Sequence, residues 1–218
     1  MSLVLSNVAA IGPWGTRLEG IDLRLSSGAI TVITGRGGCG KTLLMNVLGG
    51  TATIHRGEIA CDSESDPRIV YQSVHPLLPP GESVEAFLRS LDVEVPTHFG
   101  LNELTGLTVD CLPARYRRAL WLIAAIGRPA DVYLFDEPTL GFDREYIKNF
   151  SNLLKPLVDN GAAIAIATND LQLAADTADY GVVLGDGKIL IQGRVEELRE
   201  NINGSGLFSE LWKIHCTD

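Results

Sequence analysis

The sequence predicts an α/β fold with a mainly parallel core sheet, an N-terminal antiparallel β-subdomain and a short helical subdomain. Short apolar runs, typical of strands buried on both faces, occur at 29–34, 132–135 and 162–167. Helical patterns separate these runs, and such strand–helix alternation favours a parallel sheet. Two segments near the start, 4–8 and 20–25, instead alternate apolar and polar residues, as half-exposed strands do.

The remaining elements follow in chain order from local signals. A turn at 26–28 separates the second alternating strand from the first buried strand. A glycine-rich stretch then leads into a helix over 43–48, which Gly49 and Gly50 close. The later predicted elements are a strand at 68–72, a helix beginning at 82–88, a helical run ending at Ile126, a helix at 146–157, and a hairpin of 182–184 with 188–191 across Gly185-Asp186-Gly187.

Length and composition narrow the class of protein. A chain of 218 residues with 45% hydrophobic and 21% charged residues is expected to form one globular domain over 1–218, with a helical insert at about 73–127. The formal net charge of -9 disfavours a nucleic-acid partner, because binding to phosphate backbones needs a basic surface. No secretory leader is evident, and the longest apolar runs, about eight to ten residues, are too short to span a bilayer. We therefore expect a soluble, cytoplasmic protein.

Cysteines and histidines are scattered singly along the chain, four of each. This spacing lacks the pairs that are typical of zinc sites. It fits free thiols in a reducing compartment better than a disulfide framework. We therefore expect no zinc site.

The segment Gly35–Thr42, GRGGCGKT, fits the pattern G-x-x-x-x-G-K-[ST] between a β-branched strand and a helix. Its glycines allow backbone N–H groups to approach phosphates, and the helix N-terminus adds a positive dipole. Lys41 would reach the β- and γ-phosphates, while the Thr42 hydroxyl would bind Mg²⁺. The alternative is a glycine-rich turn with a chance lysine. The residues predicted to contact nucleotide here are Gly35, Arg36, Gly37, Gly38, Cys39, Gly40, Lys41, Thr42 and Leu43.

Two carboxylates, Asp136 and Glu137, end the apolar strand at 132–135. A carboxylate at the end of a buried strand suits Mg²⁺, which gives Asp136 a predicted metal-binding role. Glu137, one residue further, is placed to polarise an attacking water. The alternative is a polar strand end at a turn, because Pro138 follows.

Three motifs together resemble the nucleotide-binding domain of ABC-type ATPases, the ATP-binding subunit of ABC transporters. They are GRGGCGKT, the glutamine of VYQS, and LFDEPTLGFD. The resemblance covers roughly residues 3–200, and DEPT followed by x-x-x-Asp is distinctive among P-loop proteins. It implies a P-loop NTPase fold that binds and hydrolyses ATP with Mg²⁺.

The resemblance assigns roles to three further residues. Trp14 falls where the family stacks an aromatic residue on adenine; the alternative is a tryptophan packed in the β-subdomain. Gln72 matches a glutamine that senses both Mg²⁺ and the attacking water; the alternative is an exposed glutamine at a strand end. Asp143 matches an aspartate that crosses to the partner's site in a closed dimer, a role compatible with capping the helix that follows.

Two motifs depart from the family pattern. The chain has Asn169 where the family has a histidine near the γ-phosphate, and an amide can donate a hydrogen bond but cannot become cationic, so we expect weakened hydrolysis. The stretch LPARY, residues 112–116, stands where the family has Leu-Ser-Gly-Gly-Gln aimed across the dimer. Pro113 lacks both hydroxyl and N–H, so we expect a poor or unconventional contact to the partner's γ-phosphate, with a helix start that no longer recognises nucleotide as the alternative. The positions predicted to face a partner's site are Pro113, Ala114, Arg115, Tyr116 and Asp143.

The resemblance also implies partners and a location. It implies a cytoplasmic subunit, peripheral at the inner face of the cell membrane, bound to ABC transmembrane subunits and to a second ATP-binding subunit. A heterodimer is modestly favoured over a homodimer, because one site would then keep an intact signature. Two other functions stay open, a soluble non-transport ATPase of an assembly machine and a regulatory ATP-binding subunit with little turnover. Pro76–Pro80 and Phe87–Leu88 are expected to form a docking groove or, alternatively, to pack locally.

Overall fold

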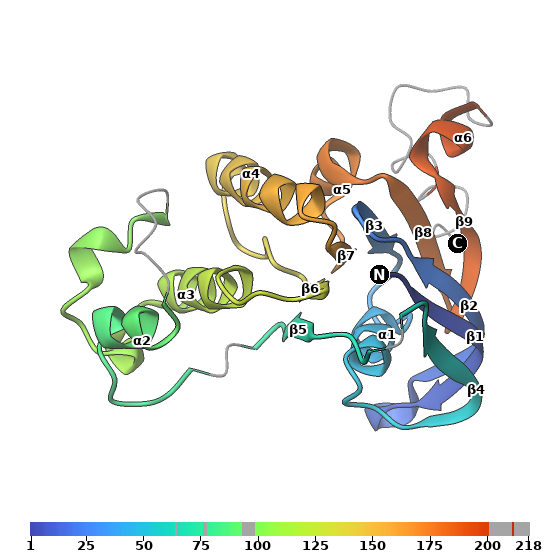
Figure 1. Ribbon diagram of the computed structural model, residues 1–218, viewed down its shortest axis with the longest axis horizontal. Coiled ribbons are helices and arrows are strands. Elements are labelled where there is room, and N and C mark those ends of the chain that lie inside the picture. Colours follow the sequence, from blue (N-terminus) through green and yellow to red (C-terminus); the bar gives the residue numbers. More distant parts are fainter. Residues whose placement is uncertain (64, 76–77, 93–98, 201–210, 212–218) are drawn as a thin grey trace.

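The computed structural model describes residues 1–63, 65–75, 78–92, 99–200 and 211, apart from the side chains of Trp14 and Glu200. Strands in these ranges form two sheets, one antiparallel and one mainly parallel. Figure 1 shows the antiparallel sheet at one end of the molecule and two helices, α2 (Val84–Ser90) and α3 (Ala114–Ile126), at the other. The expected α/β class is confirmed.

The antiparallel sheet has the order β2-β1-β4. The two alternating segments become β1 (Leu3–Ile11) and β2 (Arg17–Leu25), each longer than its pattern predicted. The third strand, β4 (Ile54–Cys61), was not predicted from the sequence. It is a mostly exposed edge strand, so it lacks the clean apolar alternation that identified the other two.

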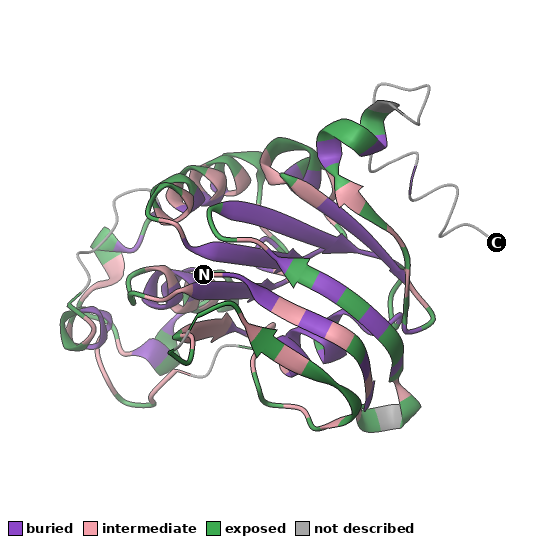
Figure 2. Cartoon of the chain, turned by 45° about the vertical axis from the view of Figure 1, so that its right-hand side comes forward, coloured by how far each residue is buried: buried purple, intermediate pink, exposed green. Residues whose placement is uncertain are grey.

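The core sheet has the order β5-β6-β7-β3-β8-β9, and its strands run parallel except for β9. Figure 2 shows that the strands in the middle of the molecule are buried, while exposed residues gather on the outer faces of the helices. The predicted buried strands and the C-terminal hairpin are confirmed. The bounds are β3 (Ala29–Thr34), β5 (Ile69–Gln72), β6 (Val132–Asp136), β7 (Ala163–Ala167), β8 (Tyr180–Gly185) and β9 (Lys188–Arg194).

Strand β7 shows how the two faces of this sheet differ. Its isoleucines, Ile164 and Ile166, belong to the core beneath α3, α4 (Arg144–Asp159) and α5 (Leu171–Thr177). Its alanines belong to the second core, which α1 (Lys41–Leu48) and the antiparallel sheet cover. Small side chains let these elements pack close to the strand. The helix α1 follows the carboxyl end of β3 directly, through the loop at 35–40.

The helices largely follow the predicted pattern. Ser83 caps α2 by accepting a hydrogen bond from Ala86 N at 3.1 Å. The helix α5, which was not predicted, is only seven residues long and begins at the cap Asp170; α6 (Val195–Glu200) closes the described part. Phe87 and Leu88 are buried in the core, as the local-packing alternative expects, whereas residues 76 and 77 lie outside the described ranges.

Candidate functional site

The carboxyl ends of β3, β6 and β7 meet at one edge of the core sheet, where a cleft of about 430 Å³ opens. Parallel α/β sheets bind ligands at this edge. The cleft unites three stretches that are far apart in the sequence, the glycine-rich loop, the end of β6 and the end of β7. Its lining residues are Pro13, Thr16, Gly37, Gly38, Gly40, Lys41, Thr42, Leu43, Asn46, Glu137 and Asn169.

The glycine-rich loop has a shape that side chains would disturb. A Cβ atom built on Gly35 would lie 2.1 Å from the Leu184 carbonyl oxygen, so a larger residue would displace the backbone. Gly40 has φ of 110° and forms the N-cap of α1. Arg36 is exposed and Cys39 is buried, and neither lines the cleft, although both were predicted to contact nucleotide.

Lys41 is 7% exposed, and its ammonium lies within the loop. Its Nζ donates to the carbonyl oxygens of Gly35 at 2.7 Å and Arg36 at 3.4 Å. It also donates to Asn169 Oδ1 at 2.9 Å, across 128 residues of sequence. The amide oxygen of Asn169 therefore faces the lysine, and its NH₂ group remains as a donor for another ligand.

Asp136 is completely buried, and neither carboxylate oxygen has a hydrogen-bond partner in the described ranges. Burial raises the pKa of this carboxyl to about 6, although the nearby Thr42 hydroxyl acts in the opposite direction. Unpaired buried carboxylates are costly unless they bind a cation or a donor. The site therefore holds two buried carboxylate oxygens near Thr42 that lack a partner among the described residues.

Gln72 ends β5, and its backbone pairs with that of Phe135, the residue before Asp136. The side chain is only 3% exposed, so the alternative of an exposed strand-end glutamine is wrong. Its Nε2 donates to Ser73 O at 2.8 Å, whereas its Oε1 is buried and unpaired within the described residues. A third unpaired oxygen thus lies on β5, the strand next to that of Asp136.

Glu137 is held at the cleft by its backbone and its carboxylate. The backbone adopts φ of 48°, in the left-handed region, and its N–H donates to Ala167 O at 2.8 Å. Its Oε2 accepts from the Thr168 hydroxyl and from Asn169 N, both at 3.3 Å. These contacts direct a carboxylate from β6 towards the loop after β7.

Residues 18–140 match the sequence model of the ABC transporter family. The chain belongs to the ABC transporter family. The P-loop cleft is the feature that this family uses to bind ATP, so the chain is an ABC-type P-loop ATPase.

Sequence relatives are ATP-binding proteins of transporters. An aliphatic sulfonates import ATP-binding protein of Ralstonia nicotianae is 28% identical over 218 residues, covering 93% of this chain and 76% of the relative. An energy-coupling factor transporter ATP-binding protein of Streptococcus agalactiae is 24% identical over 237 residues, covering 93% and 84%.

Solved structures confirm the ABC ATPase fold. An ATP-binding subunit of an ABC transporter superimposes with a TM-score of 0.83 at 19% identity, covering 97% of this chain and 99% of that chain. A dimeric ATP-binding cassette in a post-hydrolysis state, bound to ADP and Pi, superimposes with a TM-score of 0.75 at 17% identity, covering 88% and 98%. None of the helices in the described ranges of the present ABC ATPase is long and apolar enough to cross a bilayer.

In this ABC ATPase no residue of the LPARY stretch lines the P-loop cleft of its own chain, and its last two residues, Arg115 and Tyr116, line a separate pocket together with Asp143. Pro113 is the N-cap of α3 and makes no side-chain hydrogen bond there. The guanidinium of Arg115 lies 4.4 Å from the centre of the Tyr116 ring and also donates to its hydroxyl. Asp143 caps α4 by accepting from Tyr146 N at 2.9 Å, which confirms the capping role.

The structure of the ABC ATPase adds residues that the sequence did not single out. Pro13, Thr16 and Asn46 line the cleft. The spacing could have indicated Asn46, because it follows Thr42 by four residues on a helix. Arg118 donates to Leu140 O at 2.6 Å and so connects α3 to the loop before Asp143; no local pattern predicts this contact. Trp14 belongs to the turn Pro13–Gly15, beside the cleft-lining Pro13 and Thr16, but its side chain lies outside the described set.

Proposed function

We propose that this chain binds and hydrolyses Mg-ATP as the energising subunit of an ABC transporter. The observation that carries the proposal is the convergence of Lys41, Asp136 and Glu137 at one edge of the core sheet. Each supplies a different requirement of phosphoryl transfer, namely a cation for phosphate, a metal ligand and a base.

The glycine-rich loop and Lys41 would hold the phosphates. The backbone N–H groups of the loop and the N-terminus of α1 provide donors at the cleft. Lys41 now donates to backbone carbonyls and to Asn169, and it would exchange some of these bonds for β- and γ-phosphate oxygens. Trp14, in the turn beside cleft-lining Pro13, would stack on the base.

Thr42, Asp136 and Gln72 would bind Mg²⁺. The donor set fits, because all three offer oxygen and Mg²⁺ prefers oxygen ligands. The unpaired buried oxygens of Asp136 and Gln72 support this role, since a cation or its bound water would satisfy them. When bound, Mg²⁺ neutralises charge on the phosphate oxygens.

Glu137 would act as the general base for the attacking water, with Gln72 orienting that water. Its hydrogen bonds from the Thr168 hydroxyl and from Asn169 N fix the direction of the carboxylate. Asn169 would donate to the γ-phosphate through its NH₂ group while its oxygen accepts from Lys41. A neutral amide gives less stabilisation to a developing negative charge than a cationic donor does, so we propose reduced turnover.

Replacing Glu137 by Gln tests the catalytic proposal. We expect phosphate release to fall by about 100-fold or more, because an amide cannot accept the proton of water, while ATP affinity stays within about threefold. Both quantities are measured on the purified chain, with Glu196→Gln, at an exposed position of α6, as the control. Equal rates for wild type and Glu137→Gln would instead support a regulatory ATP-binding subunit with little turnover.

Replacing Asn169 by His tests the effect of the missing histidine. A neutral histidine can accept from Lys41 and donate to phosphate, so we expect turnover at pH 8 to rise about tenfold. The pH profile should also gain a limb near the ordinary histidine pKa, about 6.5, which the wild type lacks. Slower turnover at pH 8 would mean that the hydrogen bond between Asn169 and Lys41 supports turnover better than a histidine at this position does.

We propose that the chain operates at the cytoplasmic face of a membrane with transmembrane subunits and a second ATP-binding subunit. The relatives named above support this role, and the helical subdomain at about 73–127 of a single domain would provide the docking surface. We favour a heterodimer, because Pro113 and Asn169 would otherwise weaken both sites. An ATP-dependent homodimer of the purified chain with rapid turnover would contradict the heterodimer, and isolation from the native source without any membrane protein would contradict the transport role.

A further inference from the structure

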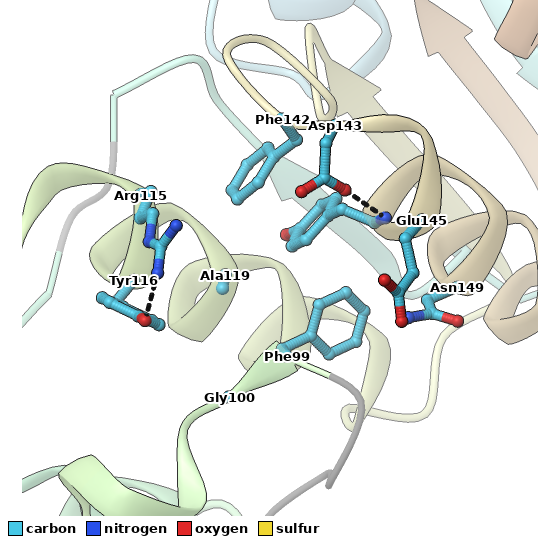
Figure 3. Close-up of a pocket in the computed structure, with 10 residues that line it drawn as sticks. Phe99, Gly100, Arg115, Tyr116, Ala119, Phe142, Asp143, Glu145 and Asn149 are labelled. Carbon is cyan, nitrogen blue, oxygen red and sulfur yellow. Dashed lines mark hydrogen bonds between the residues drawn. The ribbon is translucent and has the colours of Figure 1, made fainter.

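A second cavity, here called the α3–α4 pocket, lies between the N-terminal ends of α3 and α4 and has a volume of about 230 Å³ (Figure 3). It is separate from the P-loop cleft, and the proposed ATPase reaction uses none of its interior. Four aromatic side chains and two carboxylates distinguish it. They are Phe99, Tyr116, Phe142, Tyr146, Asp143 and Glu145.

The aromatic side chains support one another. Phe142 and Tyr146 are stacked with ring centres 3.4 Å apart and planes within 7°. Phe99 meets Tyr146 edge-on at 4.6 Å. On the side of α3, the Arg115 guanidinium already packs over the Tyr116 ring. The pocket therefore contains pre-formed aromatic surfaces, one of which holds a guanidinium.

Charge in the pocket is unevenly divided. Figure 3 shows Asp143 and Glu145 on the α4 side, whereas Arg115 lies with Tyr116 on the α3 side. Within the described ranges no lysine or arginine comes within 4 Å of either carboxylate. The α4 side is thus an anionic wall next to aromatic rings, and it complements a cation.

The hydroxyl of Tyr146 is a third feature that points to a ligand. Tyr146 is 8% exposed, and its hydroxyl is buried with no hydrogen-bond partner among the described residues. Burial raises the pKa of this phenol, so it stays neutral. An unpaired buried hydroxyl is unfavourable, and a donor that enters the pocket could bond to its oxygen.

We propose that the α3–α4 pocket binds the guanidinium of an arginine side chain from the second ATP-binding subunit. A planar guanidinium combines the required properties, because it stacks on aromatic rings, pairs with carboxylates and donates several hydrogen bonds. The inference rests on the proposed function, in which the LPARY stretch and Asp143 lie at the contact between subunits; Arg115 and Tyr116 of that stretch line this pocket, as does Asp143.

The chemistry is tested on the purified chain without nucleotide, by calorimetric titration with n-butylguanidinium and with n-butylurea. The two probes have the same shape, but only the first is charged. We expect the urea to bind at least about tenfold more weakly. Equal affinity, or no binding of n-butylguanidinium, would overturn the proposal. ATP binding is measured separately, so failure here is distinguishable from failure of the ATPase proposal.

Two variants locate the binding. Glu145→Gln removes a negative charge from the pocket, and Tyr146→Phe removes the unpaired hydroxyl. Each should weaken n-butylguanidinium binding about three- to tenfold. Glu196→Gln, in the first turn of another helix, is the matched control and should leave affinity unchanged. Unchanged affinity in both pocket variants would place the cation elsewhere and overturn the assignment.

The source of the arginine is tested in the complex purified with its partners. A photo-cross-linking amino acid at position 145 should form its adduct with an arginine-bearing segment of the second ATP-binding subunit. An adduct with a transmembrane subunit would overturn the assignment of this surface to the contact between ATP-binding subunits.

Discussion

Asp136→Asn is expected to abolish Mg-dependent ATP turnover while making the nucleotide-free protein more stable at pH 8. The activity should fall by about 10³-fold, because a metal ion contributes several kcal/mol to stabilising the transition state and the amide would hold it poorly. The stability should rise because the substitution removes a completely buried carboxylate whose oxygens have no hydrogen-bond partner in the part of the chain that the structure describes.

The pH dependence follows from the pKa of Asp136, which burial raises from 3.8 to about 6. Between these values the unfolded chain ionises while the folded chain keeps the proton, so wild-type stability falls as the pH rises. The penalty is complete above pH 6 and amounts to about 3 kcal/mol. The penalty shrinks as the pH falls towards 3.8 and disappears well below that value, where the carboxyl is neutral in both states.

Urea unfolding of wild type and Asp136→Asn at pH 4 and pH 8 measures this difference. We expect the variant to gain about 1–2 kcal/mol at pH 8, less than the full penalty because the new amide is also buried without partners, and to be about 1 kcal/mol less stable than wild type at pH 4, where most of the wild-type penalty is gone. Asp159→Asn, on the exposed end of α4, is the control and should change neither value. A variant less stable than wild type at pH 8 would show that Asp136 has a partner that stabilises its charge.

Lys41→Ala is expected to lower ATP affinity by about 10- to 100-fold and turnover by about 10³-fold. Lys41 is the cation that lines the cleft at the loop, and preorganised charge at a developing phosphate is worth several kcal/mol. The folded chain should keep its stability within about 1 kcal/mol, because the carbonyls that Lys41 leaves can bond to water in the open cleft.

Nucleotide titration and phosphate release on the purified variant measure both effects. Lys148→Ala, on the exposed face of α4, is the matched control and should match wild type. Wild-type affinity in Lys41→Ala would mean that the loop backbone alone holds the phosphates. A loss of turnover without loss of affinity would place Lys41 in transition-state stabilisation only.

Much of the fold could be predicted because its signals are local. Apolar runs predict the buried strands. The glycine-rich motif predicts the loop, because the backbone at Gly35 and Gly40 has a conformation that other residues do not readily adopt. The strand β4 and the helix α5 were missed, since an exposed edge strand and a seven-residue helix leave weak periodicity. Gln72 was identified because its motif is local in the sequence. Its burial could not be predicted, because burial depends on segments that are distant in the sequence.

What the sequence alone determined, then, is most of the strands and helices in their order, the glycine-rich loop and the presence of two carboxylates at the end of β6. Only the tertiary structure decided the partners of side chains. It paired Lys41 with Asn169, left the oxygens of Asp136 unpaired, and folded Arg115 onto Tyr116 beside the α3–α4 pocket. The physical reason is that periodicity and φ preference act within a few residues, whereas a side chain meets its partner only after strand order brings distant segments together.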